Sequence, residues 1–456
     1  MTAAPLPDPA SFAPGRSLGA RVLRSSVITM GGFAASQGLR LVSNLILTRL
    51  LFPEAFGLMA MVSVVLMALA MLSDVGLGPA IMGSRRGDDP AFLDTAWTIQ
   101  ILRGLLLWLA ALGLAGPLAR FWGEADLALY LPVAALSLLI AGFNPTRLET
   151  QNRHLRAGRV TLIELATQGI GALSAVLLAW ATGSVWALVA SNLIAALAML
   201  LLLDLGLPGP RNRLRWEREA ASELIRFGRW IFLATLCGFV IGQADKVILG
   251  RHLDLAQFGR YNIAWFLASV PLLLGGAVAR RVLIPVYRDS SPAASAANRA
   301  RIRRLRGAAL LGLMGLSGLI ALGGDRLVGL LYDPRYHAAG ILVVLIAAIQ
   351  GPAILILTCD QAALAAGDSR RFFVFTLIRA GLVTLGLLGG LQAGGLMGAV
   401  IGQGLANLAA YPALAWLLRP HGAWDPGLDA AALSLSGLAG AAAIWLHAGL
   451  FAALSG

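Results

Sequence analysis

Polar and ionisable side chains lie inside long apolar stretches of this sequence. The stretch from Leu224 to Tyr261 carries Gln243, Asp245 and Lys246 within a run of apolar residues. Ionisable groups at membrane depth cost about 2.5–3.5 kcal/mol each on insertion scales, so they usually face a wet cavity or one another. These three residues therefore indicate a candidate site.

Basic residues elsewhere in apolar stretches could join Lys246 in one cationic cavity. A guanidinium group pairs well with the oxygens of a phosphate or diphosphate headgroup. The alternative for each residue is an ion pair between helices, or a side chain that extends to the membrane surface. The predicted substrate-binding residues are Arg40, Arg103, Lys246, Arg379, Gln37, Gln100 and Gln243.

Two carboxylates, Asp245 and Glu164, are candidate proton or sodium sites for ion coupling, because burial raises the pKa of a carboxylate. The alternative is that each neutralises one of the arginines. Other chemistry lacks its motif. The single lysine follows Asp245, so no phosphate-binding loop with a Gly-Lys pair exists. The five histidines lack metal-ligand spacing, and we expect no metal, no cofactor and no catalytic residue.

Composition places these residues in a membrane protein. Hydrophobic residues make up 58% and charged residues 13% of the 456 residues, which predicts an all-α polytopic membrane protein. The net charge of +13 would favour nucleic acid in a soluble protein, but here we expect membrane lipids and no nucleic acid as partners. The two cysteines lie in apolar segments and indicate no disulfide framework.

Thirteen apolar segments are long enough to be membrane helices. With the N-terminus inside, the inward segments hold 26 arginines and the outward segments 6, which predicts a cytoplasmic N-terminus in an inner membrane. The segments are 25–48, 56–81, 93–116, 127–143, 160–181, 185–205, 224–249, 261–279, 307–322, 341–359, 372–391, 395–418 and 430–450. Prolines inside four of them, Pro132, Pro271, Pro352 and Pro412, are expected to kink their helices.

A weak repeat relates the two halves. Residues 46–57 match 248–259 at six of twelve positions, and the matches include Arg49 with Arg251 and a Phe-Gly pair in each copy. Both copies follow helices that run outward, so the pattern predicts two parallel repeats rather than an inverted pair. Coincidence between membrane-helix ends is the alternative.

We therefore predict two six-helix bundles around a central cavity, plus a thirteenth C-terminal helix. The predicted parts are a disordered cytoplasmic tail (1–24), an N-terminal bundle (25–206), a cytoplasmic amphipathic linker (207–223), a C-terminal bundle (224–419) and the extra helix (428–453). The basic linker carries Trp216, which favours the inner membrane surface. A solvated linker is the alternative.

Several motifs resemble bacterial polysaccharide (O-antigen, Wzx-type) flippases of the multidrug/oligosaccharidyl-lipid/polysaccharide exporter superfamily. In the second half they are FGxW at 227–230, DxxILGR at 245–251 and FGxY at 258–261. In the first half they are TRLLxPExFG at 48–57, SDVGLG at 73–78, Ile163-Glu164 and WALV at 186–189. The resemblance covers most of residues 20–420.

The resemblance implies alternating access, with an undecaprenyl-diphosphate-linked oligosaccharide moved from the inner to the outer leaflet. Protons or sodium ions are candidate coupling ions, and a glycan polymerase complex is a candidate partner. Three alternatives remain: a cation-coupled drug exporter or lipid II flippase of the same fold, a membrane enzyme of glycan assembly, and a scaffold without transport activity. A basic cavity argues against a cationic drug as cargo, and short outer loops argue against the enzyme.

Overall fold

Helices make up nearly all of the part of the chain that the structure describes. The computed structural model describes residues 18–73, 76–154 and 157–455, apart from the side chains of 18–30, 83, 157, 225–234, 281 and 452–455. Within these residues there is no β-strand, which confirms the all-α prediction. Three parts of the predicted features lie outside the described residues. They are residues 1–17 of the predicted tail, residues 74–75 of the SDVGLG motif and the side chains of the FGxW motif.

The helices follow the thirteen predicted segments in order, and several segments are divided into two or three helices. In the first half they are α1 (Leu18–Leu50), α2 (Pro53–Leu72), α3 (Leu77–Gly83), α4 (Pro90–Trp122), α5 (Leu127–Ala134), α6 (Leu136–Gly142), α7 (Arg147–Arg153), α8 (Ala157–Thr182) and α9 (Trp186–Gly206). In the second half they are α10 (Arg218–His252), α11 (Leu255–Ala268), α12 (Val270–Val278), the π-helical η2 (Ala279–Leu283), α13 (Ile284–Asp289), α14 (Ala296–Leu331), η3 (Pro334–Tyr336), α15 (Ala338–Ile349), α16 (Gly351–Cys359), α17 (Gln361–Ala365), α18 (Ser369–Ala409), α19 (Tyr411–Leu418), η4 (Arg419–His421), α20 (Pro426–Leu446) and α21 (Ala448–Ser455).

Aspartates mark where several long helices begin. The carboxylates of Asp89, Asp254, Asp368 and Asp425 accept hydrogen bonds from backbone N–H groups in the first turns of α4, α11, α18 and α20. Such caps satisfy donors that have no partner within the helix. At these four positions a short turn with a capping aspartate therefore precedes the helix.

Helix α18 contains two predicted segments and folds back on itself. Its backbone leaves the helical region at Gly394 and Gly395, and Gly395 has a φ of 56° that favours glycine. The two arms then run antiparallel at very short range, since a Cβ at Gly390 would lie 2.0 Å from the carbonyl oxygen of Gly398. The hairpin explains why two predicted segments appear as one helix of 41 residues.

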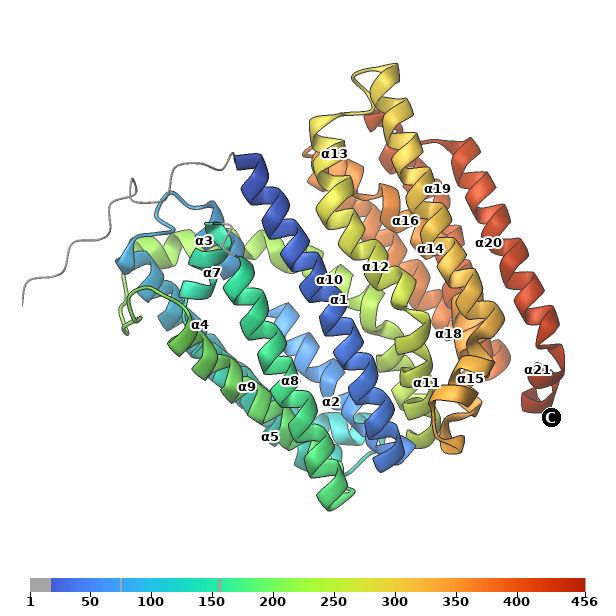
Figure 1. Cartoon of the computed structure of the whole chain (residues 1–456), viewed down its shortest axis with the longest axis horizontal. Helices are drawn as coiled ribbons and strands as arrows, with labels where there is room; N and C mark the ends of the chain where they lie inside the picture. Colours follow the sequence, from blue (N-terminus) through green and yellow to red (C-terminus); the bar gives the residue numbers. More distant parts are fainter. Residues whose placement is uncertain (1–17, 74–75, 155–156, 456) are drawn as a thin grey trace, which may run out of the picture.

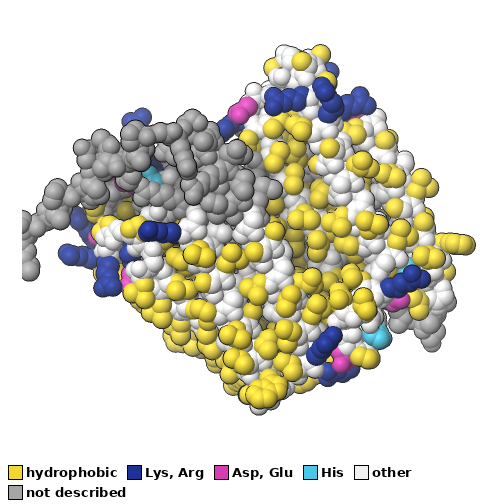
Figure 2. All heavy atoms as spheres, viewed as in Figure 1, with side chains coloured by type: hydrophobic (Ala, Val, Ile, Leu, Met, Phe, Trp, Pro, Cys, Tyr) yellow, Lys and Arg dark blue, Asp and Glu magenta, His cyan; other side chains and the backbone are white. Residues whose placement is uncertain are grey.

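The surface of the helical body is suited to lipid. Among the residues that the structure describes, seven helices are long and apolar enough to cross a membrane, or up to ten if each of three bent helix pairs is one span. Large apolar side chains such as Leu205, Leu330 and Trp445 are about four-fifths exposed. Figure 2 shows apolar side chains across the middle of one face, with most basic side chains near its margins. The chain is thus a multi-pass membrane protein.

The two halves meet at one end of the molecule. We call the end where α1 begins the upper end and the opposite end the lower end, as oriented in Figure 1. At the lower end the Phe-Gly pairs of the two repeats pack against each other, at the starts of α2 and α11. A Cβ at Gly57 would lie 2.3 Å from the carbonyl oxygen of Leu255, and one at Gly259 would lie 2.0 Å from that of Pro53. Each repeat therefore supplies a glycine that lets the other backbone approach.

Hydrogen bonds between the halves extend this lower seam. The Tyr336 hydroxyl donates to the carbonyl of Leu51 at 2.9 Å, and its ring packs edge-on against Phe56. The indole N–H of Trp122 donates to the carbonyl of Val247 at 3.2 Å. The seam thus closes the lower end with buried side chains from both halves.

The connection between the halves is extended and lies against α4. Residues 208–217 are non-helical, and α10 begins at Arg218. Backbone N–H groups of Arg213 and Arg215 donate to Asp94 and to the hydroxyl of Thr98. Hydroxyl and carboxylate groups of α4 thereby accept hydrogen bonds from the backbone N–H groups of a linker that has no secondary structure of its own.

Candidate functional site

Two predicted cations lie on neighbouring aromatic rings of α11. The ammonium of Lys246, on α10, is 4.0 Å from the ring centroid of Trp265, and Gln243 accepts its hydrogen bond at 3.0 Å. The guanidinium carbon of Arg40, on α1, is 5.0 Å from the ring centroid of Phe266. The cations come from different halves and converge on α11.

These cations lie deep within the membrane-spanning body. Arg40 and Trp265 are each ten residues from the lower ends of α1 and α11, which corresponds to about 15 Å of helix. That distance is half of a hydrocarbon core of roughly 30 Å. In the described residues neither Arg40 nor Lys246 has a carboxylate within ion-pair distance. Their contacts with ring faces stabilise the cations without neutralising them.

Asp245 points away from Lys246 into the second half. It is 2% exposed, and Tyr261 donates a hydrogen bond to its Oδ2 at 2.6 Å. Its Oδ1 has no hydrogen-bond partner in the described part of the chain. One oxygen of a buried carboxylate is therefore fixed by a phenol, while the other is open to a proton, an ion or water.

A cavity of about 230 Å³, whose largely apolar wall includes several polar side chains, adjoins Asp245 within the second half. Arg379 also lines it, and the Arg379 guanidinium donates to the side-chain oxygen of Asn407 at 3.0 Å. Gln350 lines the same cavity, and its Oε1 has no hydrogen-bond partner among the described residues. Trp265 contributes to the wall and so contacts both Lys246 and the cavity.

Two bent helices form the cavity. The helix pair α11–α12 bends by 44° at Ser269, and the pair α15–α16–α17 bends by 46° at Gln350. Pro271 and Pro352 stand in the first turn after each bend, so these predicted kinks are observed. Pro412 stands in the first turn of α19, just after the break at Ala410, whereas Pro132 lies inside α5, two residues before the last residue of that helix. Broken helices expose backbone polar groups where they line a cavity, which makes such breaks suitable for ion sites.

The remaining predicted residues lie apart from this cluster. Arg103 donates to the Ser73 hydroxyl at 3.0 Å and to the carbonyl of Ala70 at 2.6 Å, and thereby caps the end of α2. Gln100 donates to carbonyls at the end of α6 and just after it. Both therefore have structural contacts within the first half.

Glu164 lies on α8 next to α1, away from Asp245. It lines a small pocket of about 150 Å³ together with Ser36 and Gln168, which hydrogen bond to each other. Gln37 follows Ser36 on α1 and is partly exposed. The structure thus places Arg40 and Lys246 on the rings of two adjacent α11 residues, with Gln243 bonded to Lys246, and places Asp245 and Arg379 in the wall of one cavity.

Outside the membrane-spanning segments, ion pairs tie the linker to the first half. Arg86 bonds both Asp89 and Glu217, at 2.6 and 2.7 Å. The hydrogen bond from Arg86 lowers the pKa of Asp89 below its ordinary value, and both acids raise the pKa of Arg86. These charges fix the position at which α10 begins.

Several residues of the site were outside the prediction. Trp265 and Phe266 carried no signal other than being adjacent aromatic residues in an apolar helix. Tyr261 follows Asp245 by sixteen residues, and only the turn at 253–254 shows that the chain reverses between them. Gln350 precedes Pro352 at a predicted kink, which was the strongest available signal.

The fold and the polar groups at mid-depth define a multi-pass membrane protein with two helical halves that meet at a seam. A family model described as "Polysaccharide biosynthesis protein" matches residues 46–339. The chain belongs to this family of polysaccharide biosynthesis proteins, in agreement with the resemblance of its motifs.

Two characterised proteins are similar in sequence. The succinoglycan biosynthesis transport protein ExoT of Rhizobium meliloti (strain 1021) is 26% identical over 55% of this chain and 50% of its own length. The lipopolysaccharide biosynthesis protein WzxC of Escherichia coli (strain K12) is 24% identical over 55% of this chain and 51% of its own. The chain thus spans about half the length of the curated relatives it matches.

Solved structures support the architecture across the chain. The inward closed structure of the lipid II flippase MurJ superposes with a TM-score of 0.66, at 11% identity, over 94% of this chain and 98% of that one. At this identity the likeness shows the fold alone.

Proposed function

We propose that this protein is a flippase that moves an undecaprenyl-diphosphate-linked oligosaccharide across the cytoplasmic membrane, from the inner to the outer leaflet. The observation that carries the proposal is the pair of cations, Arg40 and Lys246, that face α11 from different halves at mid-depth. Membership of a polysaccharide biosynthesis family supports a glycan as part of the cargo.

The cations are suited to a diphosphate because they are held but not neutralised. Each lies on an aromatic ring, and an incoming phosphate could replace the ring as the partner of the charge without breaking an ion pair. A cationic drug would be repelled at the same position. This charge favours lipid-linked glycan cargo over drug export.

The seam supplies a gate for alternating access. In this structure the halves are joined at the lower end, which is the outer side if the arginine-rich upper end is cytoplasmic. The headgroup would enter from the inner side, bind between the halves and leave after the seam opens. The lipid tail would stay in the bilayer throughout.

Asp245 is the proposed coupling residue. A proton or sodium ion at its free Oδ1 would be close to α11, which bonds Asp245 through Tyr261 and forms the seam through Gly259, two residues earlier. Ion binding and seam opening would then act on the same helix. Glu164 remains a second candidate in the first half.

Proteoliposomes loaded with a fluorescent undecaprenyl-diphosphate oligosaccharide test the proposal. Lys246→Gln and Arg40→Gln are each expected to lower the initial flipping rate by about tenfold or more. This is the effect expected from the loss of one charge-assisted hydrogen bond to the diphosphate. Arg120→Gln, at an exposed position near the end of α4, is the matched control and should flip at the parent rate. Full activity in both cation variants would refute the role of the cations.

Two further cargoes separate the alternatives in the same vesicles. Lipid II carries the same diphosphate with a different glycan, so faster flipping of lipid II would assign the protein to that substrate. Uptake of a cationic dye with no flipping of either lipid would show a drug exporter. Glycan-bond formation by the purified protein would instead show an enzyme, and intact flipping in cells that lack the protein would indicate a scaffold.

A further inference from the structure

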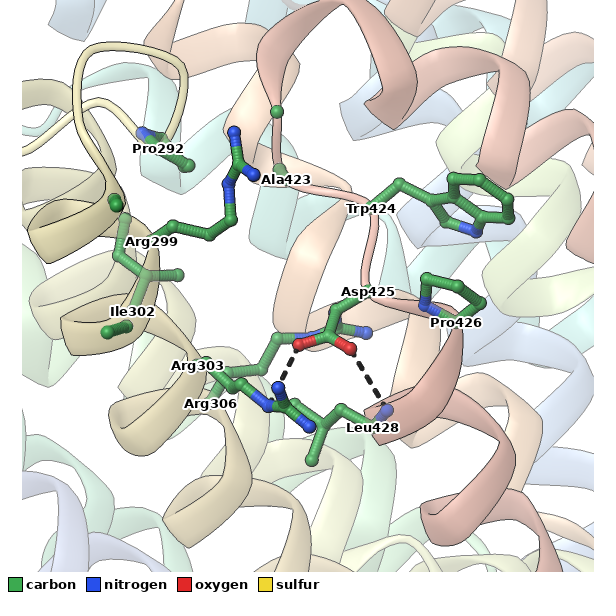
Figure 3. Close-up of a pocket in the computed structure, with 13 residues that line it drawn as sticks. Pro292, Arg299, Ile302, Arg303, Arg306, Ala423, Trp424, Asp425, Pro426 and Leu428 are labelled. Carbon is green, nitrogen blue, oxygen red and sulfur yellow. Dashed lines mark hydrogen bonds and ion pairs between the residues drawn. The ribbon is translucent and has the colours of Figure 1, made fainter.

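A second polar pocket lies at the upper end of the molecule, far from the seam. It has a volume of about 330 Å³ and lies between the start of α14, the loop before it and the segment that leads into α20. This volume is at the lower end of the roughly 300–1,000 Å³ range of small-molecule sites. Figure 3 shows Arg299, Arg303 and Arg306 on α14 across the pocket from Asp425, while the ring of Trp424 is turned away from them.

The arginines recur every three or four residues, so they share one face of α14. Arg303 pairs with Asp425 at 3.2 Å, and Asp425 also caps α20. In the described residues the guanidinium of Arg299 has neither an ion pair nor a hydrogen bond. The pocket wall therefore carries a positive charge that its own acidic residue does not balance.

Arg306 is the buried base of the pocket. Its side chain is 2% exposed and bonds Asp429 at 2.5 Å and the Thr358 hydroxyl at 3.3 Å. Its Nη1 is buried and has no hydrogen-bond partner in the described part of the chain. A buried guanidinium N–H without an acceptor is costly, and a bound anion would satisfy it.

The surroundings indicate that the anion is attached to a lipid. Below the pocket, α14 exposes Leu311 and Leu319, and α20 exposes Leu435 and Leu438, all between 49% and 71%. Trp424 lies at the rim, where tryptophan is favoured at the level of lipid headgroups. An anionic headgroup at the arginines would therefore place its acyl chains along exposed leucines.

We propose that this pocket binds the phosphate group of an anionic phospholipid from the membrane leaflet at the upper end. Arg299 and Arg306 supply free N–H donors to the phosphate, and Arg303 supplies charge. The lipid bridges α14 and α20, and so holds α20 against the rest of the second half. This site is separate from the cationic pair at mid-depth and does not depend on which cargo is flipped.

Native mass spectrometry of the detergent-purified protein tests the site. Phosphatidylglycerol is the anionic probe, phosphatidylcholine the zwitterionic control, and inorganic phosphate the water-soluble source of the same chemistry. The double variant Arg299→Gln, Arg303→Gln is expected to bind phosphatidylglycerol at least about tenfold more weakly than the parent, as for the loss of one charge-assisted hydrogen bond.

The matched control is Arg301→Gln, Arg304→Gln. It removes the same charge from the same turns of α14, but neither residue lines the pocket. Parent-like binding is expected. Equal losses in both double variants would show a diffuse electrostatic attraction and overturn the site.

Two other results would also overturn the proposal. Equal affinity for phosphatidylglycerol and phosphatidylcholine would exclude recognition of an anionic headgroup. Inorganic phosphate that binds as tightly as phosphatidylglycerol would assign the pocket to a soluble anion. If the double variant unfolds at a lower temperature than the parent, Arg299→Gln alone serves instead, because that side chain has no partner to lose in the described structure.

Discussion

The lower seam should be sensitive to a single methyl group at Gly259. In Gly259→Ala the new Cβ would lie 2.0 Å from the carbonyl oxygen of Pro53 and 2.8 Å from its carbonyl carbon. Ordinary contact begins near 3.4 Å, so the backbones of α2 and α11 must separate by more than 1 Å. Both neighbours are backbone atoms, so no side chain can rotate away to make room.

The penalty should appear as a shift between closed and open states. Overpacking a tight contact costs about 1–3 kcal/mol. Once the seam has opened, this cost disappears because the two helices no longer touch. A difference of that size changes the ratio of open to closed molecules by about 5- to 150-fold.

Cysteine accessibility at the seam measures this ratio. Leu51 is fully buried there, so Leu51→Cys can react only after opening. The native Cys237 and Cys359 are first replaced by alanine, and a membrane-impermeant maleimide is then added to cells. The labelling rate is expected to rise about tenfold when Gly259→Ala is combined with Leu51→Cys.

A matched glycine controls for the general effect of alanine on a helix. Gly113, on α4, has no atom within 4 Å of the position of a Cβ, so Gly113→Ala should leave the labelling rate at the parent value. Equal labelling in both alanine variants would refute the argument, because it would mean that the seam has room for the methyl group or does not open.

Three further outcomes are expected. Arg306→Ala should lower the unfolding temperature in detergent, because it leaves the charge of Asp429 buried without a partner at a cost of about 3–5 kcal/mol. The double variant Arg306→Met, Asp429→Leu removes both charges and should restore most of the lost stability. Tyr261→Phe keeps the ring but removes the hydrogen bond to a buried carboxylate, so thermal unfolding should show a loss of about 1–3 kcal/mol. An arginine lowers the pKa of Asp89, so this carboxylate stabilises the fold above the unfolded pKa of about 4; Asp89→Asn should therefore unfold earlier than the parent at pH 7, and the difference should vanish as the pH falls through the folded pKa.

The sequence was sufficient to predict the helices because the segments are long and apolar, and an aspartate cap marks the start of several of them. Asp89, Asp254, Asp368 and Asp425 begin helices next to predicted segments. Breaks within segments were predictable where proline marked them. The close return of α18 at Gly395 was visible only as two segments separated by glycines.

The site was less predictable because it depends on how each helix is rotated about its own axis, which decides where its side chains point. A basic residue in an apolar segment has the same local pattern whether it faces another half or the end of a neighbouring helix. Arg40 reaches the ring of Phe266, whereas Arg103 caps α2 through Ser73 and Ala70. A shift of one residue on α4 turns a side chain by about 100°, which is enough to move Arg103 from one kind of contact to the other. The apolar residues of α4 show no periodicity that would reveal which direction Arg103 faces.

Ion pairs between distant segments were equally hidden. Arg306 belongs to a run of arginines that is expected at an inner surface, yet it is buried against Asp429 of α20. Two residues separated by 123 positions give no sign of pairing in one sequence. The only available signal was that Asp429 is an acid within an apolar stretch.

The two halves share the Phe-Gly pattern at the seam but differ in their polar interior. This difference bears on the proposed site. Both Phe-Gly pairs meet at the seam, where equal shapes allow two backbones to cross at close range. The polar groups do not repeat in this way: the cavity beside Asp245 belongs to the second half, and the first half contributes Arg40 to the face of α11. A symmetric seam can open and close as a hinge-like contact, but only an asymmetric interior can bind a headgroup in one orientation. Helix α11 takes part in both, since it carries Gly259 at the seam and Trp265 and Phe266 beneath the cations. Movement of this one helix would therefore couple the occupancy of the site to the opening of the seam.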